Sequence, residues 1–380
     1  MKKAIDVEKL TEQLISIPSF VNKEINEKSV ADFIANLLYK EGFNVQKQQI
    51  ELNRYNLIAT IGNPRLWLCG HMDTVEPKNR KQLTPKYNRG KLYGLGAVDM
   101  KGGIAAILAA VNSAKIKNNL GLLFYCDEEY HFKGMRTFIK NFDARSSLAI
   151  FAEPTNLAVS NAHRGLIELY AVIKGKSGHA ARPEEGKNAI VGTSKAITSL
   201  ATILAQNYSS SEAGQTTCTL SSMRGGTQME IKNQNIIYAQ GTNSIPDTTE
   251  INLDIRPAKI GLCSNKIISL LKKCVKKEGL ILKTVKVKED LGPLITPKNQ
   301  LKILETIIGE EIGCVNYLPS QKMGYGDGQL LFEKTKTPVV YLGPGPTEAC
   351  HKEDEYVTLD SLEKTTRIFK RLIEEYAKGE

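Results

Sequence analysis

The sequence predicts an α/β protein in which a mixed, mostly parallel sheet flanked by helices carries a smaller, inserted α+β domain. Three observations lead to this prediction. The chain has 380 residues, and at roughly 100–200 residues per domain this length suggests two domains, or one domain with a large insertion. Strand-like and helix-like segments alternate in the first and last thirds, which is typical of sheets with helices on their faces. The middle third has a different order of segments.

Apolar runs in the outer thirds predict buried strands, and segments with helical periodicity predict the helices between them. In the first third we expect a helix at 103–116 and strands at 56–61, 66–69, 121–126 and 149–152. In the last third we expect a helix at 300–312, a strand at 338–342 and a terminal helix at 359–376.

The middle segments predict a small α+β unit with helices on one face of a sheet. We expect helices at 189–204 and 265–277, and strands at 166–173, 250–255 and 280–287, with a further strand at 235–239. The predicted main domain therefore comprises residues 1–166 and 290–380, and the inserted domain comprises residues 167–289.

Composition excludes several classes of protein. Hydrophobic residues make up 41% and charged residues 24% of the chain, as in ordinary soluble globular proteins. No apolar run approaches the roughly 20 residues of a membrane span, and charges interrupt the N-terminal apolar positions, unlike in a signal peptide. Seven cysteines without a CxxC motif favour reduced thiols over disulfides. We expect a cytoplasmic protein without a membrane partner.

The net charge of +10 leaves a nucleic-acid binder as an alternative, which salt-dependent binding would reveal. The excess is mostly lysine spread along the chain, with a cluster at 272–277 on a predicted helix. No aromatic interleaving or recognition motif accompanies it, so a solvated helix face is the simpler interpretation. We expect no nucleic-acid partner.

Acidic residues and histidines gather where the predicted strands end, and ligands bind at the carboxyl ends of strands in open α/β sheets. His71 and Asp73 directly follow one strand, and a carboxylate near a histidine ligand can hold its second ring nitrogen. Alone, each such residue is more simply a surface acid or a turn histidine. Together they favour a site. Asp99 lies in a glycine-rich turn directly before a predicted helix, and predicted strands are followed by Asp127, Glu128, Glu129, Glu153 and His351.

Clustered carboxylates repel one another unless a cation neutralises them. Histidine and carboxylate ligands without thiolates fit zinc, with cobalt or manganese as possible substitutes. The donors suffice for two ions sharing one carboxylate, an arrangement that activates a water molecule and polarises a carbonyl group. One carboxylate must stay unligated to move protons. The sequence therefore indicates metal-dependent hydrolysis.

Seven ordered motifs between residues 70 and 356 closely resemble those of the co-catalytic zinc aminoacylase and carboxypeptidase family. They are GHMDTV, LYGLGAVDMKGG, CDEE, AEPT, SGHAARPEEGKNAI, NSIPDTTEINLDIRP and GPGPTEACHKEDEY. The resemblance implies a zinc-exopeptidase-like catalytic domain and an inserted ferredoxin-like domain that forms a homodimer and acts as a lid.

The resemblance also implies roles for the residues at the strand ends. Asp99 would bridge two Zn²⁺ ions, with His71 and Glu153 on one ion and Glu129 and His351 on the other. A cis peptide bond is expected after the bridging aspartate, at Asp99–Met100.

Further roles follow from the same resemblance. Glu128 matches the general base, and Asp73 matches the carboxylate that orients His71. His179 would reach the partner subunit's active site and stabilise the oxyanion, although its alternative role is to cap a loop.

Four residues would contact the substrate. Arg256 resembles an arginine that binds the substrate α-carboxylate by a bidentate pair, and Asn243 lies in the same pocket, faced by a glycine loop that begins at Gly326. Arg164 would contact the acyl group or play a structural role.

The motifs indicate the reaction more closely than the substrate. We predict a dinuclear-zinc amidohydrolase that deacylates a small N-acyl amino acid, with N-acetylornithine favoured by LYGLGAVDMKGG and the GPG ending. A succinyl-diaminopimelate desuccinylase is the alternative, favoured by Arg164 and the GDG stretch at 326–328. A metal-dependent di- or carboxypeptidase and a non-catalytic protein that kept the fold are the other interpretations.

Overall fold

The computed structural model describes residues 4–142, 146–233, 235–239, 241–322 and 326–378. The chain divides into two compact units. The first unit comprises Met1–Asn161 and Thr296–Glu380, and the inserted unit comprises Ala162–Ile295. Each unit has its own cluster of buried hydrophobic residues.

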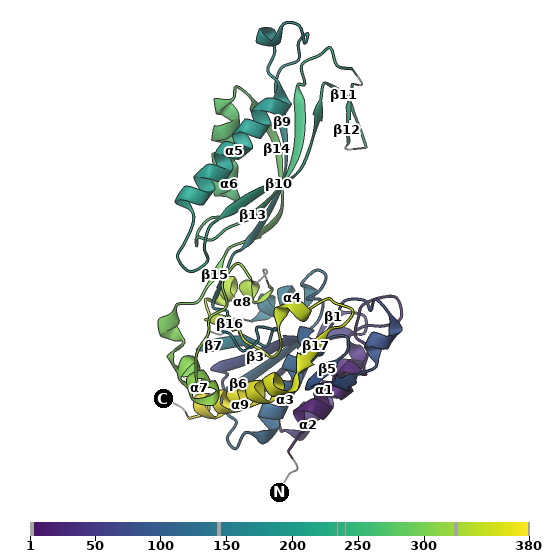
Figure 1. Ribbon diagram of the computed structural model, residues 1–380, viewed down its shortest axis with the longest axis vertical. Helices are drawn as coiled ribbons and strands as arrows, with labels where there is room; N and C mark the ends of the chain where they lie inside the picture. Colours follow the sequence, from purple (N-terminus) through teal and green to yellow (C-terminus); the bar gives the residue numbers. More distant parts are fainter. Residues whose placement is uncertain (1–3, 143–145, 234, 240, 323–325, 379–380) are drawn as a thin grey trace. The chain divides into compact units, whose positions relative to one another are not determined.

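The central sheet of the first unit is mixed and mostly parallel, which confirms the predicted class (Figure 1). Its described strands follow the order β1-β2-β6-β3-β7-β16. Strand β3 is parallel to β6 and β7, and β7 is parallel to β16, whereas β2 is antiparallel to β1 and β6. The strands are β1 (Asn44–Glu51), β2 (Arg54–Ile61), β3 (Leu66–His71), β6 (Leu120–Tyr125), β7 (Leu148–Phe151) and β16 (Val339–Tyr341).

Helices cover both faces of this sheet, because its inner strands are apolar on both sides. In β3, the Trp67 ring packs edge-on against Phe138 and Phe142. On the opposite side of the strand, Gly70 leaves the space that Ile104 and Met100 occupy, 3.0 Å from where a Cβ would lie. Figure 1 shows the helices around the sheet: α1 (Val7–Ile15), α2 (Lys28–Lys40), α3 (Gly102–Ser113), α4 (Lys133–Asn141), α7 (Lys302–Ile312), α8 (Gly328–Thr335) and α9 (Leu359–Tyr376).

A small three-stranded sheet orders the C-terminal segment of the first unit. Strand β5 (Lys91–Tyr93) pairs antiparallel with both β4 (Lys86–Asn88) and β17 (Tyr356–Thr358). This sheet brings the segment that precedes β17 next to the glycine-rich turn that precedes α3.

The inserted unit is an α+β domain with the ferredoxin-like order of elements, as predicted. Its four main described strands form an antiparallel sheet in the order β10-β13-β9-β14, and both helices cover one face (Figure 1). The elements are β9 (Leu166–Lys174), α5 (Ala189–Asn207), β10 (Thr217–Gly226), β13 (Thr248–Arg256), α6 (Ser264–Lys277) and β14 (Ile281–Leu291).

The strand predicted at 235–239 exists but lies outside this main sheet. It is β12 (Asn235–Tyr238), which pairs with β11 (Gln228–Lys232) in a two-stranded hairpin. The remaining strand of the main sheet is the edge strand β10, which the sequence did not predict. A further short pair, β8 (Ala162–His163) and β15 (Leu294–Ile295), lies where the inserted unit begins and ends.

Two expectations from the composition concerned membrane spans and cysteines. No helix within the described ranges has the length and apolar character needed to cross a membrane. All seven cysteines lie in described ranges and are free thiols.

Candidate metal centre

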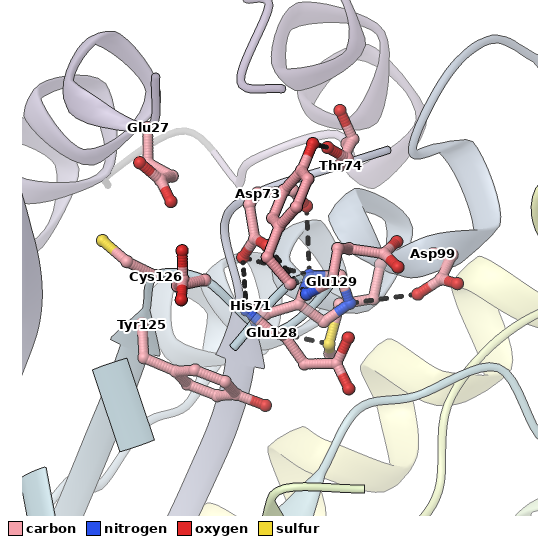
Figure 2. A network of polar contacts seen from close by, with 12 residues as sticks. Glu27, His71, Asp73, Thr74, Asp99, Tyr125, Cys126, Glu128 and Glu129 are labelled. Carbon is pink, nitrogen blue, oxygen red and sulfur yellow. Dashed lines mark hydrogen bonds and ion pairs between the residues drawn. The ribbon is translucent and has the colours of Figure 1, made fainter. Parts of the chain in front are cut away.

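Three of the predicted ligands lie at the carboxyl ends of parallel strands, and Asp99 and His351 reach them from the turn before α3 and the segment before β17. Strand β3 ends at His71, the turn with Glu128 and Glu129 follows β6, and Glu153 follows β7. Figure 2 shows His71, Asp99, Glu128 and Glu129 directed toward one region. The fold therefore brings together side chains that are far apart in the sequence.

His71 is fixed from both sides of its ring. Its side chain is fully buried, and Nδ1 lies 3.0 Å from the main-chain oxygen of Asp73. Nε2 lies 3.0 Å from Asp99 Oδ1 and 3.9 Å from Glu153 Oε1. A carbonyl acceptor at Nδ1 favours the tautomer that presents the Nε2 lone pair to a ligand.

Asp73 contacts both His71 and the acidic turn after β6. Its carboxylate lies 3.7 Å from His71 Nδ1, beyond hydrogen-bond distance. The carboxylate instead accepts hydrogen bonds from the backbone N–H groups of Glu128, at 3.1 Å, and Glu129, at 2.9 Å. Asp73 thus makes its hydrogen bond to His71 through its main chain, and its side chain lies next to His71 while it holds the acidic turn after β6.

Asp99 places one carboxylate oxygen beside each histidine. Oδ1 lies 3.0 Å from His71 Nε2, and Oδ2 lies 3.3 Å from His351 Nε2. Burial opposes the charge, but hydrogen bonds with His351 and His71 hold the pKa of Asp99 well below its usual range. The Asp99–Met100 peptide bond is cis. A carboxylate in this position can bind one cation through each oxygen.

Glu355 holds the turn that carries Asp99, a role that the sequence did not reveal. The Glu355 side chain accepts hydrogen bonds from the backbone N–H groups of Gly96, Val98 and Asp99, at 3.1, 3.0 and 3.2 Å. Burial raises its pKa to about 7. Its only signal in the sequence is its place in the acidic segment after His351.

His351 and Glu129 form the opposite side of the cluster. His351 Nε2 lies 3.1 Å from Glu129 Oε2. The His351 side chain is 52% exposed, whereas that of Glu129 is 6% exposed. Hydrogen bonds with Asp99 and Glu129 raise the pKa of His351 to about 10. This side of the cluster is therefore open to solvent, unlike the side formed by His71.

The residues present fit divalent cations. Ligand atoms of His71, Asp99 and Glu129 all lie within 4.8 Å of one another. Burial raises the pKa of Glu153 to about 8, and the Asp99 carboxylate adds to this shift. A nearby cation favours the ionised form of such a group. Imidazole and carboxylate donors suit zinc and related first-row ions, and each oxygen of Asp99 lies beside a different histidine.

Glu128 lies in the same turn but is not held by the cluster. Within the described ranges its carboxylate forms no hydrogen bond. Burial raises its pKa well above the usual value, and the neighbouring acids Asp327, Glu153 and Glu129 add to the shift. A raised pKa suits a carboxylate that takes up and releases a proton near neutral pH.

Asp327 is a second acidic residue that sequence reasoning did not assign. It is buried, and Oδ1 accepts a hydrogen bond from the Tyr125 hydroxyl at 2.9 Å. Burial raises its pKa to about 7. Its signal in the sequence is its place in the GDG stretch at 326–328.

Arg256, expected to bind the substrate carboxylate, ends strand β13 of the inserted unit. Its Nε and Nη2 donate to the two oxygens of Asp254, both at 2.8 Å. The Arg256 side chain is 30% exposed. The guanidinium therefore already makes a bidentate ion pair within its own unit. A substrate carboxylate would have to bind it beside the Asp254 carboxylate or displace that carboxylate.

His179 and Asn243 lie on exposed loops of the inserted unit. His179 Nδ1 accepts a hydrogen bond from the backbone N–H of Ala181 at 3.1 Å, which is the loop contact expected of a capping histidine. The main-chain oxygen of Asn243 accepts a hydrogen bond from Ala180 at 2.8 Å. The two loops are thus joined, with both side chains toward solvent.

The other two substrate candidates, Arg164 and Gly326, also make local contacts. Arg164 Nη1 donates to Thr217 Oγ1 at 3.4 Å. A Cβ at Gly326 would come within 2.7 Å of the Tyr341 hydroxyl, so a glycine is needed there for packing.

Sequence comparison supports the family suggested by this donor set. Residues 67–375 match the peptidase family M20/M25/M40. The chain is 30% identical over 400 residues to the acetylornithine deacetylase of Proteus mirabilis, and the match covers 98% of this chain and 97% of that protein.

Solved structures share the fold over the whole chain. The aminopeptidase PepT from Bacillus cereus has a TM-score of 0.75 at 21% identity, over 99% of this chain and 100% of that one. The YxeP protein of Bacillus subtilis, a dinuclear metal-binding peptidase from the M20 family, has a TM-score of 0.67 at 15% identity, over 97% of each chain. The chain therefore belongs to the peptidase family M20/M25/M40 and is a metal-dependent hydrolase.

Proposed function

We propose that this chain is a dinuclear-zinc amidohydrolase that removes the acyl group from an N-acyl amino acid, with N-acetylornithine as the substrate. Similarity to an acetylornithine deacetylase over nearly the whole of both chains carries this proposal. The position of Asp99 between His71 and His351 supports the use of two ions. The ligands would be His71 and Glu153 on one side of Asp99, and Glu129 and His351 on the other.

The acidic turn after β6 supplies the proton transfers. Two zinc ions at this centre would polarise the amide carbonyl and lower the pKa of a water molecule. Glu128 accepts a proton from the attacking water and delivers it to the departing nitrogen as the C–N bond breaks, which gives a carboxylate and an amine. The raised pKa of Glu128 supports both steps, because the group must hold the proton between them.

Residues of the inserted unit complete the site in this proposal. The unit forms a homodimer, and His179 of one subunit stabilises the oxyanion in the other. Arg256 binds the substrate α-carboxylate, Asn243 and the loop at Gly326 set its position, and Arg164 contacts the acyl group. Seven free thiols support a reducing, cytoplasmic environment.

The test is amine release by the zinc-loaded protein from N-acetylornithine, N-succinyl-diaminopimelate and a panel of dipeptides, each repeated with a chelator. We expect turnover of N-acetylornithine that the chelator abolishes. Preference for the succinylated substrate would replace the proposed acyl group with a dicarboxylic one, and turnover of dipeptides alone would make the protein a peptidase. Turnover that survives complete metal removal would overturn the mechanism.

A further inference from the structure

A buried ion network lies behind the acidic turn, on the side away from Asp99. At its centre is Arg54, the first residue of β2, whose side chain is 7% exposed. Its Nε and Nη2 donate to the two carboxylate oxygens of Glu27, at 2.8 and 2.5 Å, and the Glu27 side chain is fully buried. Figure 2 shows Glu27 beside Cys126, on the opposite side of the network from Asp99.

The same guanidinium reaches the turn that carries Glu128. Arg54 Nη2 also donates to Asp127 Oδ1 at 2.8 Å, and the Asp127 side chain is 3% exposed. A third contact, from Nη1 to Glu51 at 2.8 Å, lies on the solvent side, where Glu51 is 41% exposed. Only a planar group with several fixed donors can hold two buried carboxylates in this way.

Asp127 has a backbone conformation that needs such support. Its φ is 69°, in the left-handed region that L-residues other than glycine seldom adopt. Its main-chain oxygen accepts from Phe132 N at 2.7 Å, and its Oδ2 accepts from Lys133 N at 3.3 Å. Asp127 therefore determines both the direction of the chain at Glu128 and the path of the loop that leads to α4.

Strand β2 contributes a second contact on the same side. Asn56, two residues after Arg54 and thus on the same face of the strand, accepts a hydrogen bond from Cys126 N at 3.1 Å and donates to Gly134 O at 2.9 Å. Asp73 holds the N–H groups of Glu128 and Glu129. The turn is thus held on the side of the candidate metal centre by Asp73 and on its other side by Arg54 and Asn56 of β2.

We propose that Arg54, anchored by Glu27, is a positioning residue that sets the catalytic geometry of Glu128 and Glu129 through Asp127. The expected effect of Arg54 on turnover rests on the proposed function. Its effect on the conformation of the turn does not, because that effect depends only on the fold. Arg54 holds the side chain of Asp127, and the conformation of Asp127 directs the next two side chains into the centre. Glu27 fixes Arg54 itself, because a single buried guanidinium is immobilised by a bidentate partner.

The experiment compares Arg54→Lys and Arg54→Met with a control of similar burial. Arg54→Lys keeps the positive charge, but a lysine cannot hold Glu27 and Asp127 at once. It also keeps the experiment interpretable if Arg54→Met fails to fold. The control is Glu41→Gln, which disrupts the buried Glu41–Lys117 pair, 2.6 Å apart and 6% and 19% exposed, in the same unit. Amide hydrogen exchange of a peptide covering 126–133 reports the turn without requiring any activity.

For Arg54→Lys we expect faster exchange over 126–133 and a fall in kcat of about 10- to 100-fold with KM nearly unchanged, as for small misplacements of catalytic groups. Glu41→Gln should change the melting temperature but neither readout. Unchanged exchange and kcat in Arg54→Lys, despite a lower melting temperature, would reduce Arg54 to a stabilising role. If the wild type turns over none of the substrates, the proposed function fails, and the exchange experiment still decides whether Arg54 positions the turn.

Discussion

The two units present their candidate functional residues in different ways. In the first unit, His71 is fully buried and Asp99 is 14% exposed. Hydrogen bonds hold His71 at the end of β3 and Asp99 in the turn before α3. In the inserted unit, His179 and Asn243 lie on exposed loops, and Arg256 is paired with its own neighbour. The proposed metal ligands His71 and Asp99 are thus fixed inside one unit, whereas the proposed site residues of the inserted unit lie on exposed loops or in a local ion pair. Mutations should therefore separate catalysis, oxyanion binding and stability.

The largest expected effect comes from Glu128, the proposed base, in the first unit. Glu128→Gln keeps the size of the side chain but cannot accept a proton. We expect kcat to fall by about 10⁴-fold, at the upper end for general acid–base catalysis, with bound metal unchanged because Glu128 is not a proposed ligand. Substantial residual kcat, measured beside metal content, would refute the base assignment.

The next largest effect should come from His179 in the inserted unit. His179→Ala should lower kcat by about 10²- to 10³-fold, as when one oxyanion donor is removed, without loss of metal. His179→Asn is the sharper variant, because its side-chain oxygen can still accept the Ala181 N–H that Nδ1 now accepts. Wild-type kcat in His179→Asn would show that the histidine only caps its loop.

Separate cores predict separate losses of stability. Leu200 is fully buried in the core of the inserted unit, so Leu200→Ala should destabilise that unit by about 2–5 kcal/mol. The sole tryptophan, Trp67, lies in the first unit, so denaturant titration by its fluorescence should be unaffected while circular dichroism shifts. Leu68→Ala, in the other core, is the matched control and should shift the fluorescence midpoint. Equal shifts of both signals in Leu200→Ala would mean that the units unfold together.

The smallest effect is a pH dependence confined to the inserted unit. Burial lowers the pKa of His163 to about 4, below its value in the unfolded chain. The unfolded chain therefore binds more protons, and the stability of this unit falls as pH drops from about 6.5 toward 4. Between pH 7 and 5 we expect a loss of about 2 kcal/mol from this group. Denaturant titrations followed by circular dichroism should show that the free energy of unfolding depends less on pH in His163→Gln than in the wild type. An identical pH dependence in both proteins would argue against a buried neutral histidine.

The sequence predicted the elements whose local hydrophobic pattern matches their burial in the fold. The strands at 66–69 and 121–126 are unbroken apolar runs buried on both faces, so their ends could be located and the acidic residues after them expected to meet. Family resemblance supplied the role of each residue but not its contacts. The structure adds that the main-chain oxygen of Asp73 is a hydrogen-bond partner of His71.

Other parts depend on contacts that local pattern does not contain. Strand β10, with the sequence TCTLSSMRGG, is a half-exposed edge strand without an apolar run, and helices α1 and α2 mix charges into their apolar positions. Glu355 and Arg54 contact turns, and Asp327 contacts Tyr125 at the end of β6, all far away in the sequence. Each therefore looks like an ordinary charged residue until the fold brings its partner near. The support of the site was therefore harder to predict than the site itself.

The central claim is that Asp99 joins two cation sites within the first unit. The most direct test is calorimetric titration of zinc into metal-free protein, for the wild type and for Asp99→Ala. We predict two equivalents per chain for the wild type and at most one, bound more weakly, for Asp99→Ala. Two equivalents of unchanged affinity in Asp99→Ala, or a single equivalent in the wild type, would contradict the claim.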